Sequence, residues 1–535
     1  MASVRTFDYI IIGAGSAGSI LANRLSEDPS VSVLVVEAGG SERHTFIEMP
    51  AAFIKTVDDP RFNWCFFTEP SDGVKGRAIL FPRGKALGGS SAINGHLYVR
   101  GQARDYDTWA QLGNRGWSYD DVLPYFRRSE YRPEGDPHVR GHDGPLHVSD
   151  IHEKHPLCEA FIAGAGQLGI PVDPDYNKGT QDGVSYYQRT IRNGRRWSAA
   201  HAFLRPAMRR PNVTVITGAV VSGITFEGTR ATGIDYRHHG RPMQALAGRE
   251  VVLSAGAIAS PQLLQLSGIG PGHLLRDIGV PVRHELPGVG EGFQDHYAVR
   301  VAARVKDHQT LNERARGLRL GWEVVKWMTA GKGMLAFSPA HVATFLKSMP
   351  HLDTPDLQFV FTPASYAEGM IGALQPFPGM TTGTWQMRPE SKGYVRARTR
   401  HPHDAPLIQP NYLDAETDQR ALVAGVRWCR RFLATAPLKP YFEAETLPGR
   451  DIETDDEILD YARARGATVY HAISTCRMGP DPMAVVDERL RVKGLHNLRV
   501  IDASVMPTMP SANTNAATMM IAEKGADLLK ATATT

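Results

Sequence analysis

Three glycines near the start of the chain have the spacing of a phosphate-binding turn. Gly13, Gly15 and Gly18 follow an apolar run at 8–12 and precede a second apolar run, 31–36, that ends at Glu37. Glycine lets the backbone turn tightly and approach a pyrophosphate, and the helix that starts there offers unpaired N–H groups. Glu37 lies 19 positions after Gly18, where a carboxylate can accept hydrogen bonds from ribose hydroxyls. The pattern predicts a strand, helix and strand that bind an adenine dinucleotide, with NAD and FAD both open.

A second segment rich in glycine and serine covers residues 81–98. Paired glycines and serines let backbone come close to a flat or anionic ligand. A tight structural turn would explain two of these glycines, but not an ordered series that ends at Asn94. We therefore expect this segment to contact the same ligand.

Further strand-like runs must complete the domain that positions these turns. They lie at 213–217, 232–236, 250–256 and 498–503, and a helix is expected at 518–529. The fold class is therefore predicted to be α/β, with a Rossmann-like nucleotide-binding domain built from separated stretches. The predicted parts of this domain are 1–155, 195–299 and 466–535, and 300–465, with its tryptophans, phenylalanines and prolines, is predicted to be an α+β substrate cap.

Composition narrows the class of protein. The 535 residues, 42% hydrophobic and 22% charged with a formal charge of +4, are typical of a soluble globular protein of two joined domains or one elaborated α/β body. The sequence has no basic patch with interleaved aromatic residues, so it does not predict a nucleic-acid partner. The four cysteines are too scattered for a zinc site, so no metal is expected. No apolar run reaches the ~18 residues needed to span a bilayer, and no signal segment is evident, so we expect a cytoplasmic protein, with peripheral contact to the inner membrane left open.

Three later segments decide the family. Residues 256–270, 470–479 and 513–518, together with the two glycine-rich segments, resemble the glucose-methanol-choline (GMC) oxidoreductases, and the resemblance runs from Phe7 to about Lys530. Within that family the chain is most similar to bacterial choline, L-sorbose and alcohol dehydrogenases. The resemblance implies FAD in a Rossmann-like domain, beneath an antiparallel sheet that roofs the substrate site.

The resemblance also implies which residues contact FAD. Gly13, Gly15 and Gly18 would hold the pyrophosphate, Glu37 the ribose, and Val220 would lie near the adenine. The full expected set is Gly13, Gly15, Ser16, Ala17, Gly18, Glu37, Ala38, Trp64, Arg83, Gly84, Gly88, Gly89, Ser90, Asn94, Gly95, His96, Leu97, Val220, Tyr470, Asp502, Ala503, Asn515 and Ala516. Relatives that bind FAD covalently can carry histidine where this chain has Ile93, so non-covalent FAD is expected.

The catalytic pair is expected to be His471 and Asn515. His471 lies in the family's YHxxxT segment, and imidazole, with an ordinary pKa near ~6.5, suits a base that removes a hydroxyl proton. We expect kcat/KM to rise with pH near or somewhat above that value. Asn515, three residues before Thr518, would hydrogen-bond the substrate oxygen, whereas Asn513 would only hold a turn.

Two further histidines, His296 and His341, lie in segments similar to those of the family. His296 is expected to be structural. His341 stands about where several similar proteins carry an acid, and choline-active relatives need an acid for the trimethylammonium group. Because a histidine stands there in place of an acid, choline is not favoured as the substrate. The alternative interpretation is that His341 is an ordinary histidine of the cap.

The expected reaction is FAD-dependent oxidation of a CH–OH donor. A primary alcohol, polyol or aryl alcohol would give its proton to His471 and its hydride to flavin N5, leaving an aldehyde or ketone. A quinone, a dye or oxygen would reoxidise the flavin, and the resemblance favours a quinone or dye. The alternatives are a hydroxynitrile lyase that keeps an unused flavin, choline dehydrogenase proper, and a flavin-binding protein without catalysis.

Overall fold

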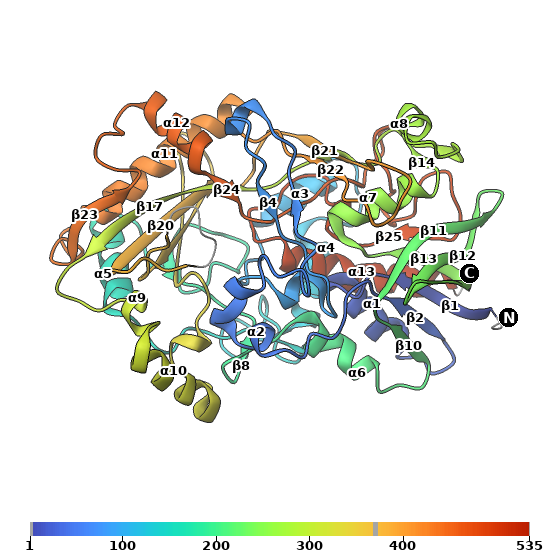
Figure 1. The fold of residues 1–535 in the computed structure, drawn as a ribbon, viewed down its shortest axis with the longest axis horizontal. Helices are drawn as coiled ribbons and strands as arrows, with labels where there is room; N and C mark the ends of the chain where they lie inside the picture. Colours follow the sequence, from blue (N-terminus) through green and yellow to red (C-terminus); the bar gives the residue numbers. More distant parts are fainter. Residues whose placement is uncertain (1–3, 368–372, 534–535) are drawn as a thin grey trace.

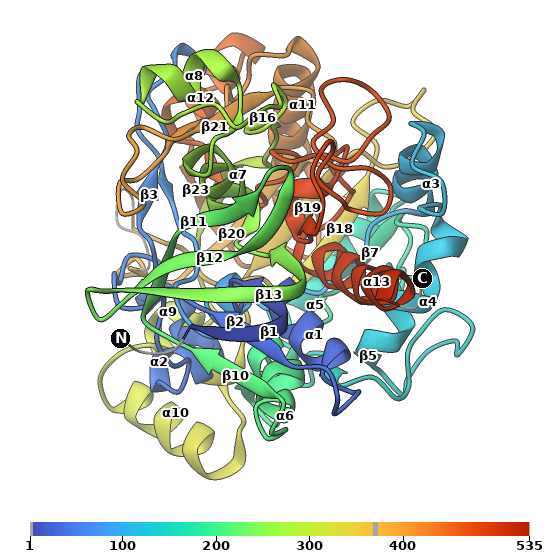
Figure 2. The same cartoon turned by 90° about the vertical axis from the view of Figure 1, so that its right-hand side faces the viewer.

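The structure is a computed structural model that describes residues 4–367 and 373–533. Figure 1 shows two sheets side by side, one near the chain termini and one at the opposite end of the molecule. Figure 2, turned by 90°, shows the C-terminal helix α13 (Asn515–Ala533) beside α1 (Ser16–Leu25) on the first sheet. The two ends of the chain therefore build one domain together.

The first sheet is the nucleotide-binding sheet, in the order β10-β2-β1-β13-β12-β11, with β25 on β13. Its members β10, β2, β1, β13 and β25 pair in parallel, whereas β12 and β11 add an antiparallel hairpin. The apolar runs of β1 and β2 are buried because helices cover both faces of a parallel sheet. The strands are β1 (Arg5–Ile12), β2 (Val33–Val36), β10 (Val213–Ile216), β11 (Ala219–Glu227), β12 (Arg230–His238), β13 (Arg241–Leu253) and β25 (Leu498–Val500).

The second sheet is antiparallel, in the order β23-β17-β20-β19-β18-β7, with β24 on β17. Helices α5 (Pro156–Gln167) and α11 (Glu416–Leu433) pack on one face around Phe161, Phe359 and Phe432. The other face lines a cavity. The strands are β7 (Gly183–Tyr186), β17 (Tyr297–Val305), β18 (Val342–Leu346), β19 (Leu357–Thr362), β20 (Gly379–Gln386), β23 (Phe442–Leu447) and β24 (Ala467–Thr468).

The remaining elements connect and cover these sheets. The helices are α2 (Thr45–Glu48), α3 (Ala103–Gln111), α4 (Tyr119–Ser129), α6 (Arg205–Ala207), α7 (Gly256–Leu266), α8 (Gly272–Asp277), α9 (Leu311–Arg314), α10 (Gly317–Ala330) and α12 (Asp455–Arg465), with short helical turns η1 (Pro50–Lys55), η2 (Asp72–Val74), η3 (Gly89–Ala92), η4 (Ala200–Leu204), η5 (Met334–Ala336) and η6 (Ala503–Val505). Short strands are β3 (Phe66–Phe67), β4 (Leu80–Phe81), β5 (Glu130–Tyr131), β6 (Leu146–His147), β8 (Ile191–Arg192), β9 (Arg195–Arg196), β14 (Ile269–Gly270), β15 (His284–Glu285), β16 (Glu291–Phe293), β21 (Gly393–Arg396) and β22 (Leu407–Gln409).

The predicted fold class is confirmed: a Rossmann-like α/β domain carries an antiparallel-sheet domain. The predicted strand runs at 213–217, 232–236 and 250–256 correspond to β10, β12 and the end of β13. The antiparallel sheet also takes in β7, at 183–186, which pairs with β18 although it lies far outside 300–465. The division of the chain into domains at particular residues remains a prediction.

Candidate active site

A cavity of about 790 Å³ extends from the nucleotide-binding sheet to the open face of the antiparallel sheet. Every residue of the expected site lines it except Gly18, Gly88 and Ala516. Gly18 packs α1 on β1, since a Cβ there would lie 1.9 Å from the carbonyl oxygen of Gly13. Gly88 donates its N–H to the carbonyl of Ala14 at 2.8 Å, and Ala516 is buried within α13. These three support the wall of the cavity and do not face it.

The first glycine turn forms one end of the cavity. Gly13 has a φ of 98°, and an added Cβ would lie 2.6 Å from the carbonyl oxygen of Ser254. Among the described residues no side chain caps the start of α1, so its first-turn N–H groups are available to an external acceptor. Glu37 follows β2, and its Oε1 and Oε2 accept the N–H groups of Gly39 and Ala14 at 2.8 and 2.9 Å. A carboxylate keeps further lone pairs, so Glu37 can still accept from a ribose hydroxyl.

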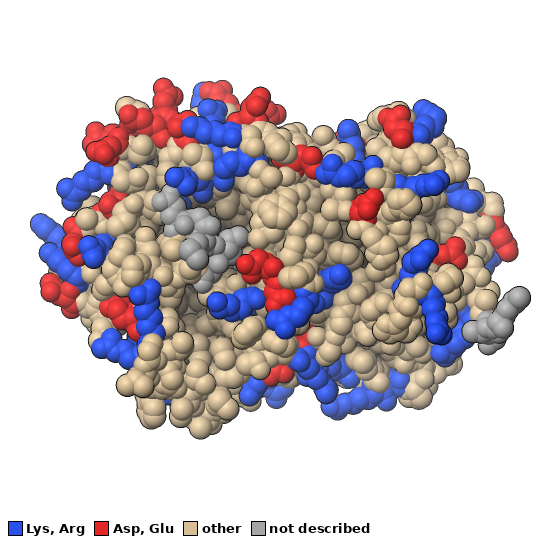
Figure 3. All heavy atoms as spheres, viewed as in Figure 1, with Lys and Arg blue, Asp and Glu red and all other residues tan. Residues whose placement is uncertain are grey.

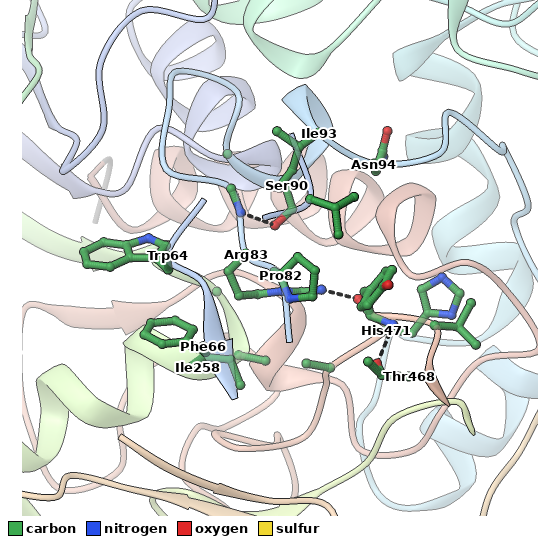
Figure 4. Close-up of a pocket in the computed structure, with 18 of the residues that line it drawn as sticks. Trp64, Phe66, Pro82, Arg83, Ser90, Ile93, Asn94, Ile258, Thr468 and His471 are labelled. Atoms are coloured by element: carbon green, nitrogen blue, oxygen red, sulfur yellow. Dashed lines mark hydrogen bonds between the residues drawn. The ribbon is translucent and has the colours of Figure 1, made fainter. Parts of the chain in front are cut away.

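The second glycine-rich segment packs directly on the first. An added Cβ at Gly89 would lie 2.7 Å from the Cα of Gly15, so only glycine permits this contact. Figure 4 shows Trp64 and His471 on opposite sides, with Arg83 between them and Ser90, Ile93 and Asn94 from the second segment facing them. Arg83 donates to the carbonyl oxygen of Tyr470, and Ser90 Oγ accepts the N–H of Gly84 at 3.1 Å. This end of the cavity therefore brings backbone, aromatic and cationic groups to one ligand.

These features fit FAD. The uncapped helix start and the two opposed glycine turns suit a pyrophosphate, and the part of the cavity lined by Trp64, Ile93 and His471 suits an aromatic ring. Val220 of β11 and Ala38 lie at the nucleotide end of the same cavity. Ile93, which also lines the cavity, has no nucleophilic side chain for a covalent bond.

His471 is held by its backbone at the junction of the two domains. Its N–H donates to Oδ1 of the buried Asp295 at 2.6 Å, and the N–H of Tyr470 donates to Oγ1 of Thr468 at 2.7 Å. Tyr470 has a φ of 68°, which is unusual for a residue other than glycine. The anchored turn aims the imidazole into the cavity.

A chain of hydrogen bonds fixes the tautomer of His471. His296 Nε2 lies 2.7 Å from the carbonyl oxygen of Met387, which can only accept, so His296 carries its proton on Nε2. His296 Nδ1, 2.8 Å from His471 Nδ1, must then be the acceptor. His471 is consequently protonated on Nδ1 and presents the lone pair of Nε2 to the cavity. His296 is thus part of the site's support, in keeping with its expected structural role.

The asparagine beside His471 is Asn513, which was expected only to hold a turn, whereas Asn515 was expected in this place. Asn513 Nδ2 lies 3.1 Å from His471 Nε2, and its Oδ1 accepts from Gln358 Nε2 at 3.2 Å. Asn515 starts α13 and accepts from Ser16 Oγ at 2.6 Å, at the first glycine turn. The two residues are separated by the turn into α13, which directs their side chains to different parts of the cavity.

Burial lowers the pKa of His471 well below its ordinary value, and the nearby His296 and the positive charge of Arg83 lower it further. Burial also lowers the pKa of His296 to about 4. Both rings are therefore neutral at pH 7. A neutral imidazole whose Nε2 carries no proton, and accepts a hydrogen bond from Asn513, is the form that a proton acceptor needs.

His341 does not face the cavity. It is buried beside Phe337, and its two ring nitrogens have no hydrogen-bond partner among the described residues. The neighbouring Pro339 and Ala340 line the cavity instead. The identity of residue 341 therefore says less about the substrate than its sequence position suggested.

Side chains of the antiparallel sheet line the other end of the cavity. The ring centroids of Trp385 of β20 and His471 lie 6.4 Å apart. Ala298 of β17 pairs with Trp385 across the two strands. Arg300, two residues along β17, lines the same face, and its guanidinium carbon lies 5.5 Å from the ring centre of Tyr366. Arg300 was not among the predicted site residues, although the alternation of side chains along a strand after His296 would have placed it on one face with Ala298.

Charge differs between the two ends of the cavity. Among the described lining residues the acids are Glu37, Asp404 and Asp502. Asp502 accepts from Gly256 and Ser260 of α7, and the backbone of Asp404 accepts from Gln262 of the same helix, so both lie on the nucleotide side. In the described part of the chain, Arg300 makes no ion pair, and no acid among the described lining residues lies at the substrate end.

Elsewhere on the molecule, Figure 3 shows Lys and Arg interspersed with Asp and Glu over the face in view. No group of three or more possible metal ligands lies together in the described residues. Within 4–367 and 373–533, no helix is long and apolar enough to cross a bilayer.

Comparison with protein families matches GMC oxidoreductase models to residues 7–298 and 389–522. Human mitochondrial choline dehydrogenase is 43% identical, covering 98% of this chain and 90% of its own length. A Pseudomonas putida alcohol dehydrogenase [acceptor] is 37% identical, covering 98% and 95%. Among solved structures, pyridoxine 4-oxidase from Mesorbium loti has a TM-score of 0.87 at 31% identity, covering 97% of this chain and 98% of that one.

Proposed function

Since the chain belongs to the GMC oxidoreductase family, we propose that it oxidises a neutral or anionic alcohol with His471 as the base. The similar proteins include an alcohol dehydrogenase and an FAD-dependent oxidoreductase. The observation that carries this proposal is the chain from Met387 through His296 to His471, which leaves Nε2 unprotonated. Asn513 beside that nitrogen supplies the second polar group.

The residues act on the alcohol in a defined order. The hydroxyl donates to His471 Nε2, while Asn513 Nδ2 donates to the hydroxyl oxygen. As the proton moves to Nε2, the imidazolium keeps its Nδ1–H on His296, and Asn513 stabilises the developing alkoxide. The bound FAD would supply the acceptor for the hydride that leaves the adjacent carbon. A carbonyl compound is left, and His471 holds one proton.

FAD would be held by the two glycine turns, Glu37 and the segment from Arg83 to Leu97. We propose that it is bound without a covalent link, because Ile93 offers no nucleophile. Acid precipitation should release the yellow flavin into the supernatant. Flavin that stays on washed, precipitated protein would contradict this part of the proposal.

The substrate proposal separates this chain from choline-active relatives. Identity to choline dehydrogenases of about 40% favours choline as the second candidate. A trimethylammonium group, however, is repelled by a nearby cation, and Arg300 places a cation at the substrate end of the cavity. We therefore propose a polyol, a primary or aryl alcohol, or a hydroxy acid in place of choline.

The test is anaerobic mixing of the holoenzyme with a panel of alcohols that includes choline. Bleaching of the flavin absorbance by a non-cationic alcohol supports the proposal. Flavin that stays oxidised with every alcohol, while a cyanohydrin is cleaved, would show a lyase. Repeating the reaction in air tests the acceptor: we propose a quinone or dye, and stoichiometric peroxide at full turnover would show an oxidase.

A further inference from the structure

Helix α10 (Gly317–Ala330) carries an exposed apolar face that plays no part in the proposed reaction. Leu318 is 95% exposed, Met328 69%, Trp322 61% and Val325 47%. Their spacing of four, three and three residues puts them on one side of the helix. Figure 1 shows α10 projecting at the lower edge of the molecule, and Figure 3, in the same view, shows an uncharged surface there.

The opposite side of α10 is anchored in the protein. Trp327 is buried and donates its Nε1–H to the carbonyl of Gly194 at 2.8 Å. The buried Glu323 accepts from Arg314 at 2.8 Å and from the N–H of Met334 at 2.8 Å. These contacts hold the helix in one orientation. Its other, apolar side therefore faces solvent.

Basic residues predominate on the helix itself, although Glu153, paired with Arg314, and Asp307 lie near its first turn. Within residues 315–333 the single acid is Glu323, which is buried, whereas Arg316, Arg319 and Lys332 are exposed. An apolar stripe with tryptophan and leucine, bordered by arginine and lysine, is the pattern of a helix that lies in the headgroup region of an anionic bilayer.

The position of α10 links this face to the cavity. It packs on η5, which in turn packs on η1, and Phe53 and Ile54 of η1 line the cavity. We propose that α10 docks the enzyme on an anionic membrane surface, with Leu318, Trp322, Val325 and Met328 in the interface and Arg319 and Lys332 toward the lipid phosphates. This brings the η1 wall of the cavity near the lipid.

The test is sedimentation of the holoenzyme with vesicles of phosphatidylcholine alone or mixed with phosphatidylglycerol. We expect binding to the mixed vesicles that weakens as salt is raised. The double variant Leu318→Ser with Trp322→Ser should lose about tenfold or more in affinity. The matched double variant Met243→Ser with Leu246→Ser, at exposed apolar positions on β13, should bind as wild type.

Flavin content should be unchanged in both double variants, because none of the four side chains lines the cavity, and melting temperatures confirm that both variants are folded. Equal binding by the two double variants, or no preference for the anionic vesicles, would overturn the proposal. Sedimentation velocity gives the remaining outcome: a wild-type dimer that Leu318→Ser with Trp322→Ser dissolves, without vesicle binding, would show that a second copy covers this face and would also overturn it.

Discussion

His296 Nδ1 lies 2.8 Å from His471 Nδ1, and the carbonyl of Met387 fixes the proton on the far nitrogen of His296. A buried neutral histidine thereby holds a second one in the tautomer that a base requires. His296 does not touch the substrate end directly, so it is a positioning residue.

Replacement of His296 should separate positioning from folding. His296→Ala removes the acceptor for His471 Nδ1–H, and we expect flavin reduction to slow by ~10–10²-fold, because one oriented hydrogen bond is lost. His296→Gln keeps an acceptor oxygen and should recover part of the rate. Stopped-flow reduction under nitrogen measures both; an alanine variant as fast as wild type would exclude the positioning role.

The pH dependence should follow the burial of His471. Protonation of Nε2 removes the base, so kcat/KM falls as pH falls through the pKa of the free enzyme. Burial lowers that pKa, and the midpoint should therefore lie below ~6.5. This direction is opposite to the sequence expectation, which had no information on burial. A limb with its midpoint above pH 7 would assign the ionisation to another group.

Asn513 and Asn515 give a matched pair of variants. Asn513→Ala should slow flavin reduction by ~10–10³-fold with normal FAD content, since it removes the donor beside His471 Nε2. Asn515→Ala, which loses the contact with Ser16, should mainly weaken FAD retention on gel filtration. The reverse pattern would restore Asn515 as the catalytic partner.

Arg300 should select against cationic substrates. We expect Arg300→Glu to raise kcat/KM for choline by about tenfold and to lower it for hydroxy acids, because the charge facing the tail is reversed. Arg304→Glu is the control: Arg304 is on the same strand but does not line the cavity. Equal effects of the two variants would point to a long-range field and not to a contact.

Local sequence was sufficient for the nucleotide-binding domain, because glycine spacing and buried parallel strands are local signals. The pairing of the strand at 183–186 with the antiparallel sheet was not predicted, because its contact with β18 joins residues far apart in the chain. The neighbour of His471 could not be predicted either. Asn513 and Asn515 are chemically alike and two residues apart, and only the start of α13 decides which side chain faces the imidazole.

The most direct test of the account is anaerobic flavin reduction by the His471→Ala holoenzyme, measured by stopped flow with FAD occupancy checked first. We predict a rate ~10²–10⁴-fold below wild type, equivalent to ~3–5 kcal/mol of barrier, with near-normal FAD content and partial recovery in added imidazole. Reduction within a few-fold of wild type would contradict the account, because some other group would then remove the hydroxyl proton.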